Sequence, residues 1–304
     1  MNASSLDLLR QKVRNLDCLP VLPSVLRKLT ELISQDLEMV NLDRVVDAIQ
    51  CDESLAAQCL RTANSALFSA RTQVESLRQA VMALGLWRVR DLVFSCTLPR
   101  LFSAVVDGMV PAVFWRHALG TALVSQRFAQ RLGVKHEEKF YLAGLLHDIG
   151  ILVNSLLCPD EFHAALSEAR ELGLPLHEAE LQVLGFSHCE SGRILAEVWK
   201  LAPDLGDVIE FHHLERPEGP TREITAVVHL ADTLCRVRDL GYGYYEAREF
   251  DLPAEPAWHL LAEKYPNAAR LDLVRFTFEL DEFAIEVRSL VDSLLSGTPQ
   301  EVRQ

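Results

Sequence analysis

The sequence predicts an all-α protein, and three observations point to that fold class. Apolar residues recur three and four positions apart in one segment after another, which places them on one face of a helix. Serine, asparagine or aspartate precedes several of these segments, and glycine or proline follows them, as at helix ends. The N-terminal third shows no alternation of apolar and polar residues of the kind that half-buried strands show.

The first third of the chain is predicted to be a packing unit of five helices. The segment Leu19–Pro23 holds two prolines that keep the backbone extended, and Ser24 then caps the first helix. The five helices are expected at residues 24–33, 41–49, 52–63, 76–85 and 86–98. Pro99 is expected to end the last of them. No catalytic residue is predicted here, because Asp52 and Asn64 are residue types that more often cap helices and form turns.

From Val113 onward the chain is predicted to continue as helices. They are expected at residues 113–133, 159–172, 175–184, 187–199, 203–213 and 224–237. Between the first two, residues 143–150 read as the apolar end of a helix, followed by His147, Asp148 and then a glycine. Gly150 is predicted to adopt the left-handed conformation that closes a helix.

The last part of the chain is predicted to be a loop followed by further helices. Residues 241–256 are turn-rich and acidic and read as a connection, and residues 258–264 read as a short helix. The β-branched and aromatic content of residues 271–278 leaves their conformation open. Residues 280–295 form an amphipathic helix that packs on the core or on a second copy, so a homodimer is one arrangement left open. Residues 296–304 are expected to fray.

Seven histidine and aspartate residues form a predicted metal site. Each lies at a helix end or on an apolar helical face, where a polar group needs a strong partner. The seven are His117, His147, Asp148, His188, His212, His213 and Asp232. Imidazole and carboxylate together suit Zn, Fe, Mn or Ni. Because seven ligands exceed the needs of one ion, we predict two metal ions about 3.5–4 Å apart, bridged by Asp148.

Each of these residues also has a structural explanation when it is taken alone. His117 would be a hydrogen-bonded core histidine, and His188 would be exposed at the start of a helix that Ser187 and Glu190 cap. Paired histidines such as those at 212–213 favour the negative end of a helix dipole. The metal site is preferred because all seven candidates fall within one stretch of the chain.

Two more residues are predicted to lie near the site. His229 stands three positions before Asp232 and is expected to support a ligand from outside. Glu180 precedes His188 by eight positions, and the sequence leaves open whether it ligates, orients a ligand or is solvated. The remaining histidines are predicted to be surface or structural residues: His136, His163, His177 and His259.

Composition and charge narrow the classes of protein. The chain of 304 residues is 49% hydrophobic and 24% charged, as ordinary folded proteins are. We find neither a long uncharged apolar run nor the layout of a secretory signal in Met1–Arg14, so no membrane association is expected. Seven scattered cysteines indicate reduced thiols and a cytoplasmic protein. A net charge of −13 argues against an extended nucleic-acid-binding surface.

A set of short motifs now connects the two halves of the chain. They are LPVLP at 19–23, DESL at 52–55, ANS at 63–65, AVMALG at 80–85, GLLHDIG at 144–150, HH at 212–213 and AD at 231–232. With these motifs the chain, from about residue 19 to residue 238, resembles the HDOD proteins, bacterial proteins with an HD-related output domain. The resemblance implies a helical N-terminal subdomain (1–105), an HD-like subdomain (106–240) and a helical C-terminal extension (241–304).

The resemblance also extends to the HD-GYP phosphodiesterases, which use two metal ions to hydrolyse cyclic di-GMP. By that resemblance six of the candidates would be ligands, and His117 would match the first histidine of the wider HD superfamily. Two departures stand out. HD-GYP enzymes have a lysine where this chain has Ile151, and their Gly-Tyr-Pro loop is missing from residues 214–220. The tripeptide 241–243 is not that loop, because it lies past Asp232.

Two functions follow from these observations. The first is a regulatory protein in signal transduction, with a metal-binding HD-like half and a protein partner that meets the N-terminal helices. The second is a metal-dependent phosphohydrolase or phosphodiesterase acting on a nucleotide or cyclic dinucleotide, in which Asp148 would be catalytic. A phosphate would then be held by Arg116, Lys200 or Arg222. The sequence leaves open whether the protein is an enzyme.

Overall fold

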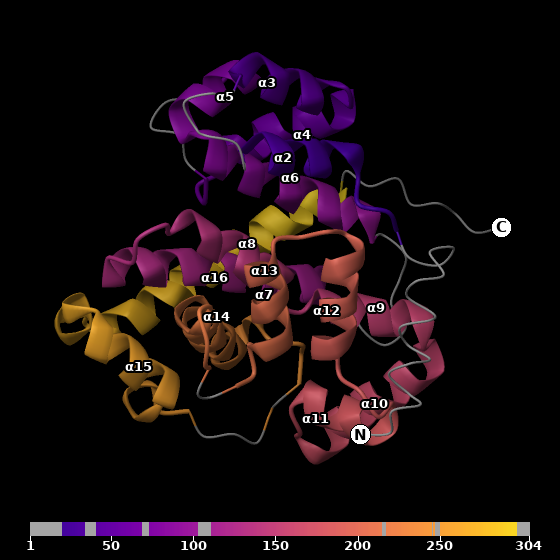
Figure 1. Cartoon of the computed structure of the whole chain (residues 1–304), viewed down its shortest axis with the longest axis vertical. Coiled ribbons are helices and arrows are strands. Elements are labelled where there is room, and N and C mark those ends of the chain that lie inside the picture. Colours follow the sequence, from indigo (N-terminus) through magenta and orange to yellow (C-terminus); the bar gives the residue numbers. More distant parts are fainter. Residues whose placement is uncertain are drawn as a thin grey trace. The chain divides into compact units, whose positions relative to one another are not determined.

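The secondary structure of the described residues is helical throughout (Figure 1). The computed structural model describes residues 20–33, 41–68, 73–102, 111–214, 217–244, 246 and 250–296. Within these ranges there is no strand, which confirms the predicted all-α class. The predicted frayed end beyond residue 296 and the N-terminal residues before Pro20 lie outside the described residues.

Contacts between Cα atoms divide the chain into two compact units. The larger unit comprises Met1–Pro20 and Ala104–Ala284, and the smaller unit comprises Val21–Ser103 and Ile285–Gln304. The end of the chain is therefore grouped with the N-terminal helices. The division into three subdomains at residues 105 and 240 remains a prediction.

The smaller unit contains the five predicted helices. They are α2 (Ser24–Ile33), α3 (Leu42–Gln50), α4 (Glu53–Ala63), α5 (Leu77–Leu84) and α6 (Leu86–Leu101). Asp52 caps α4 by accepting a hydrogen bond from the Leu55 amide, and the Asn64 side chain ties the end of α4 to the backbone of Val74. Both residues are therefore local structure formers, as predicted.

Pro99 does not end α6, so that part of the prediction is wrong. The helix continues through Pro99 to Leu101, and the amide of Phe102 still donates to the carbonyl of Leu98. A proline this close to a helix end removes one hydrogen bond from a turn that packing on the other helices already holds.

The larger unit holds every predicted ligand and most of the remaining helices. These helices are α7 (Pro111–Leu132), α8 (Glu138–Leu146), α9 (Ile149–Leu157), α10 (Pro159–Leu172), α11 (Leu176–Val183), α12 (His188–Val198), α13 (Pro203–Phe211), α14 (Arg222–Cys235) and α15 (Pro256–Lys264). Helix α7 packs on α8 and α14, while α12 packs on α9 and α13. The packed helices bring residues far apart in the sequence to one place.

Gly150 has a different role from the one predicted. It lies in the first turn of α9 and is not among the glycines with positive φ, so it closes no helix. A Cβ atom there would lie 1.9 Å from the carbonyl oxygen of His188 and 2.6 Å from the amide nitrogen of Gly192. The residue must be glycine because α9 and α12 cross backbone against backbone at this point. The crossing holds Asp148 beside His188.

Helix α14 is followed by a single π turn, Arg236–Leu240. The predicted helix 224–237 thus ends as an α-helix at Cys235 and changes to a wider turn. Such turns are frequent at functional sites, because the extra residue redirects the side chains that follow. Here it leads into Gly241 and Tyr242.

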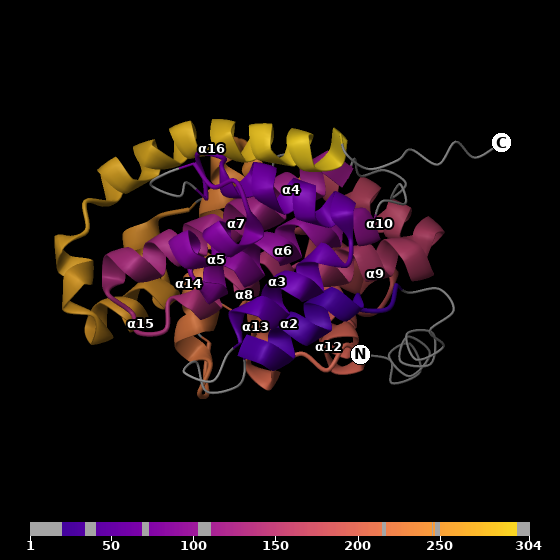
Figure 2. The same cartoon turned by 90° about the horizontal axis from the view of Figure 1, so that it is seen from above.

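The predicted segments 271–278 and 280–295 belong almost entirely to one helix, α16 (Leu273–Ser296). Figure 2 shows α16 as an unbroken helix. Residues 271–278 are therefore not a strand. Phe283, Val287 and Val291 of α16 are buried, which confirms that this helix packs on the core of its own chain. Val274, Phe278 and Ile285 are exposed, and the homodimer remains a prediction.

One segment, Glu138–Leu157, is long and apolar enough to cross a membrane by length and composition alone. It comprises α8, the His147-Asp148 turn and α9, and 89% of its most apolar window is buried inside the protein. Core helices of globular proteins have the same composition, so this segment is weak support for a membrane span.

Candidate metal centre

The seven predicted ligands come from five places in the larger unit and meet in two clusters. His117 lies on α7, and His147 and Asp148 form the turn between α8 and α9. His188 begins α12, the two histidines 212–213 follow α13, and Asp232 lies on α14. The structure thus brings together all seven residues.

The first group is the carboxylate-rich cluster: His117, His147, Asp148 and Asp232. The Nε2 atom of His117 lies 3.3 Å from Nε2 of His147 and 3.1 Å from Oδ1 of Asp232. The Nε2 atom of His147 lies 3.0 Å from Oδ2 of Asp148. All four side chains are fully buried, so solvent does not screen these groups from one another.

The second group is the histidine-rich cluster: His188, Cys189, His212 and His213. The Nε2 atoms of His188 and His213 lie 3.0 Å apart. Oδ1 of Asp148 lies 3.1 Å from Nε2 of His188 and also 3.1 Å from Nε2 of His212. Asp148 therefore directs one carboxylate oxygen toward each cluster.

The outer ring nitrogens of these histidines are held by fixed acceptors. Nδ1 of His117 lies 2.9 Å from the carbonyl oxygen of Leu240, and Nδ1 of His147 lies 2.7 Å from that of Gly144. Nδ1 of His212 lies 2.9 Å from the carbonyl oxygen of Ile209. A carbonyl oxygen can only accept, so each Nδ1 carries the proton. In the neutral form of each ring, which is the form that binds metal, Nε2 directs a lone pair into a cluster.

Glu180 lies outside the clusters and holds His188. Its Oε2 atom is 2.6 Å from Nδ1 of His188 and accepts from the amide of the same residue at 2.8 Å. Asn154 of α9 donates to the other oxygen at 2.9 Å. Of the three alternatives that the sequence left open for Glu180, this geometry matches orientation of a ligand.

His229 and His177 also lie close to the histidine-rich cluster. Nδ1 of His229 lies 2.8 Å from the backbone carbonyl oxygen of His212 and so supports the backbone that carries this candidate ligand. The ring of His177 stacks on that of His213, with 4.0 Å between the ring centroids. The sequence predicts a surface or structural role for His177, and no sequence pattern indicates this contact.

Electrostatics differ between the two clusters. Burial disfavours charge on His117, but hydrogen bonds to Asp148 and Asp232 raise its pKa to about 9. Burial would also raise the pKa of Asp148, yet His147 and His188 hold it well below its usual range. In the histidine-rich cluster burial lowers the pKa of His212 and, together with His212 and His177, that of His213.

Two side chains that follow Asp232 also reach the site. Arg236, four residues on, donates to Oδ2 of Asp232 at 2.6 Å and to Glu246 at 2.9 Å. The hydroxyl of Tyr242 donates to Oδ2 of Asp148, and its ring lies 4.5 Å from that of His117. Sequence reasoning missed both; only the four-residue spacing of Arg236 from Asp232 was a usable signal.

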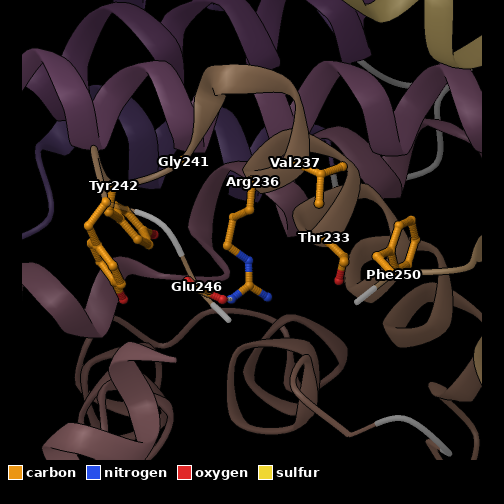
Figure 3. Close-up of a pocket in the computed structure, with 8 residues that line it drawn as sticks. Thr233, Arg236, Val237, Gly241, Tyr242, Glu246 and Phe250 are labelled. Carbon is orange, nitrogen blue, oxygen red and sulfur yellow. Dashed lines mark hydrogen bonds and ion pairs between the residues drawn. The ribbon is translucent and has the colours of Figure 1, made fainter. Parts of the chain in front are cut away.

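A cavity of about 220 Å³ (Figure 3) has in its wall Arg236 and Tyr242, which donate to the two acids of the carboxylate-rich cluster. It is lined by Thr233, Arg236, Val237, Gly241, Tyr242, Tyr244, Glu246 and Phe250. In Figure 3 the guanidinium of Arg236 extends toward Glu246. Tyr242 lines this cavity and also donates to Asp148, so the cavity and the cluster share one side chain.

The arrangement of these nitrogen and oxygen atoms suits coordination of a metal ion better than it suits hydrogen bonds among the side chains themselves. Nε2 of His212 and Oδ1 of Asp148 are buried without a hydrogen-bond partner. Buried polar atoms without a partner are rare, and a bound ion or water would satisfy them. Pairs of Nε2 atoms at 3.0 and 3.3 Å are likewise poor hydrogen-bond pairs when the proton of each ring is on Nδ1. The residues present therefore suit divalent transition metals.

Two solved structures of bacterial proteins are similar to this chain in fold. An HDOD domain protein of unknown function from Geobacter sulfurreducens is 30% identical, with 96% of this chain and 98% of that chain covered and a TM-score of 0.82. A Shewanella amazonensis protein described as a putative phosphohydrolase is 25% identical, with coverages of 96% and 99% and a TM-score of 0.70.

Sequence comparison gives a matching family and one curated relative. An uncharacterised protein of Treponema pallidum is 26% identical over 227 residues, which is 74% of this chain and 43% of that relative's length. The chain thus spans less than half of that protein. The model of the HDOD domain matches residues 19–215, about two thirds of the chain. The chain belongs to the HDOD family.

Proposed function

We propose that this protein is a signal-transduction module whose larger unit binds two transition-metal ions and whose role requires no turnover. The observation that carries the proposal is the position of Asp148, which directs one oxygen to each of two buried clusters. A carboxylate placed in this way suits a bridging ligand between two ions. His117, His147 and Asp232 would complete one ion's ligands, and His188, His212 and His213 those of the other.

Several features favour signalling over catalysis. Ile151, at the position where the related HD-GYP enzymes have lysine, is buried in α9 and offers a phosphate no charge. Arg236, the cation beside the clusters, already pairs with Asp232 and Glu246. Of the predicted phosphate-binding residues, Lys200 lies beyond the end of α12 that is opposite His188, and α12 alone separates its two ends by about 15 Å. Arg222 begins α14, about 15 Å along the axis from Asp232.

The second candidate is a metal-dependent phosphohydrolase or phosphodiesterase. Its support is the complete set of ligands and the likeness to a Shewanella protein described as a phosphohydrolase. Metal ions, when bound, would supply Lewis acidity and a hydroxide at neutral pH. The cavity next to Tyr242, with Tyr244 and Phe250 in its wall, would then accept the planar base of a nucleotide.

The smaller unit is the part that we propose meets a protein partner. Pro23 and Val25 of its first helix, with Leu55 and Leu101, line a hollow of about 480 Å³ on this unit. An apolar hollow rimmed by polar residues is typical of a peptide-binding surface. The six described cysteines are all free thiols, in keeping with a cytoplasmic location.

Metal content and turnover, measured on the same protein, distinguish the two functions. The protein is purified without chelators, its metals are counted by elemental analysis, and hydrolysis of an aryl phosphodiester and of cyclic dinucleotides is assayed. Two metals per chain without turnover support the signalling function. Turnover that Asp148→Ala abolishes would establish the phosphohydrolase instead. If His147→Ala is as stable as the wild type and neither contains metal, the metal centre is wrong.

A further inference from the structure

Cys189 is a residue of the histidine-rich cluster that the seven predicted ligands do not include. It is the second residue of α12, directly after His188, and its side chain is buried. One ligand atom from each of His188, Cys189, His212 and His213 lies within 4.8 Å of every other. The thiol is thus within the same small volume as three imidazole nitrogens.

A second observation shows that this volume calls for a ligand. His212 is completely buried, and its Nε2 atom has no hydrogen-bond partner. Because Nδ1 of the same ring is bound to the carbonyl of Ile209, Nε2 has an unused lone pair that points into the cluster. The Nε2 atoms of His188 and His213 lie 3.0 Å apart. A cation satisfies all three nitrogens at once.

We propose that the Cys189 thiolate is a ligand of the metal ion in the histidine-rich cluster. This inference rests on the proposed function, in which both clusters bind metal. When the ion binds, the S–H bond breaks, the proton passes to solvent, and a sulfur–metal bond forms. The two clusters then differ in kind: one offers sulfur and imidazole, and the other offers imidazole and carboxylate.

The difference in ligands predicts a difference in metal preference. Thiolate and imidazole select Zn²⁺, Co²⁺ or Fe²⁺, whereas a carboxylate-rich site also accepts Mn²⁺. Loading with a single kind of metal would therefore fill the clusters at different concentrations. The histidine-rich cluster is expected to take cobalt or zinc first.

Cobalt absorption provides the test, because a thiolate bound to Co²⁺ gives a charge-transfer band in the near ultraviolet. The chelator-treated protein is titrated with Co²⁺, and both absorbance and bound cobalt are measured. We expect the band in the wild type and its loss in Cys189→Ser. Removing a direct ligand should also weaken cobalt binding by at least the roughly 10–100-fold that loss of an outer partner costs.

Cys235→Ser is the control, because Cys235 is another buried thiol, on α14, that belongs to neither cluster. It should keep the band. Far-ultraviolet circular dichroism of the metal-free variants shows whether each is folded. If Cys189→Ser does not fold, Cys189→Ala takes its place, because a band in the wild type alone does not identify which thiol binds cobalt.

The outcomes separate this inference from the proposed function. Wild-type protein that binds two cobalt ions without a thiolate band would overturn the role of Cys189 and leave the metal centre intact. A band that persists in Cys189→Ser would overturn it as well. Wild-type protein that binds no cobalt would overturn the metal centre itself and, with it, the role of Cys189.

Discussion

The two clusters of the larger unit share Asp148, but they stabilise their buried polar side chains in opposite ways. In the carboxylate-rich cluster, opposite charges compensate each other: His117 has a raised pKa, and the acids beside it have lowered ones. In the histidine-rich cluster burial lowers the pKa values of His212 and His213 and keeps these two rings neutral, whereas Glu180 outweighs burial and raises the pKa of His188. The first cluster is therefore closer to being satisfied without metal than the second.

The surroundings differ in the same sense. Tyr242 and Arg236 cover the carboxylate-rich cluster with hydrogen bonds to its two acids. The histidine-rich cluster is bounded by the stacked ring of His177 and retains the partnerless Nε2 of His212. A complete set of candidate metal ligands can therefore be buried in two ways. Either opposite charges on the ligands stabilise one another, or the ring nitrogens stay neutral and keep lone pairs without a partner. The second way depends more strongly on the ion.

The largest expected effect comes from Gly150→Ala, which would break both clusters together. The added Cβ would meet the carbonyl oxygen of His188, a backbone atom that cannot move without α12. Overpacking of this kind costs about 3 kcal/mol or more, and we expect loss of metal and of stability in urea unfolding. In the control, Gly120→Ala, the nearest atom belongs to the flexible side chain of Leu240, so the effect should be smaller. Equal losses of stability and metal in the two variants would show that the close approach of α9 and α12 is not the cause.

Asp148→Asn should remove metal from both clusters, whereas Asp232→Asn should remove it from only one. The amide is nearly the same size as the carboxylate but lacks the charge that two ions share. Elemental analysis should show about two metals per chain falling to none in the first variant and to about one in the second. If Asp148→Asn keeps one ion, the clusters are independent and Asp148 is not shared.

Glu180→Gln should weaken metal binding at the histidine-rich cluster alone. The carboxylate holds Nδ1 of His188, and loss of such an outer partner typically costs about 10–100-fold in metal affinity. Competitive titration with a coloured chelator measures this change. The neighbouring exposed Glu178, changed to glutamine, is the control and should behave as the wild type. A loss at the carboxylate-rich cluster instead would assign Glu180 another role.

The smallest effect is expected from Tyr242→Phe, which removes one hydroxyl from above the carboxylate-rich cluster. A hydrogen bond to a charged acceptor contributes about 1.5–3 kcal/mol, so the metal-free protein should lose stability of that order. The metal-loaded protein should still hold both ions. Tyr244→Phe is the matched control, since the Tyr244 hydroxyl is buried without a hydrogen-bond partner and should cost nothing to remove. Equal losses in the two variants would mean that the contact with Asp148 is not stabilising.

Much of this molecule could be predicted from the order of its residues. Helix positions follow from apolar spacing and caps such as Asp52 and Ser187, which act within a few residues. The seven candidate ligands were recognisable because a polar residue on an apolar helical face is conspicuous without a partner. Local rules therefore located the fold class and the residues that the structure gathers into the clusters.

The remaining features depend on which helices meet, and no local rule contains that information. The sequence predicts a helix stop at Gly150, whereas its actual constraint is the backbone of α12, about 40 residues further along the chain. Tyr242 and Cys189 carry no motif, and their importance arises only when the π turn and the start of α12 are placed against Asp148 and His212. The division of the ligands into two groups likewise appears only in three dimensions.

The π turn after α14 has a genetic consequence. Its five residues, Arg236–Leu240, include one more than an α-helical turn would use. Deleting a single codon there would restore ordinary helical geometry and rotate everything downstream by about 100°. The hydrogen bond between His117 and the carbonyl of Leu240 would then be lost, and so would the hydrogen bond from Tyr242 to Asp148. An in-frame deletion of three nucleotides is therefore enough to uncover the carboxylate-rich cluster while every ligand codon stays unchanged.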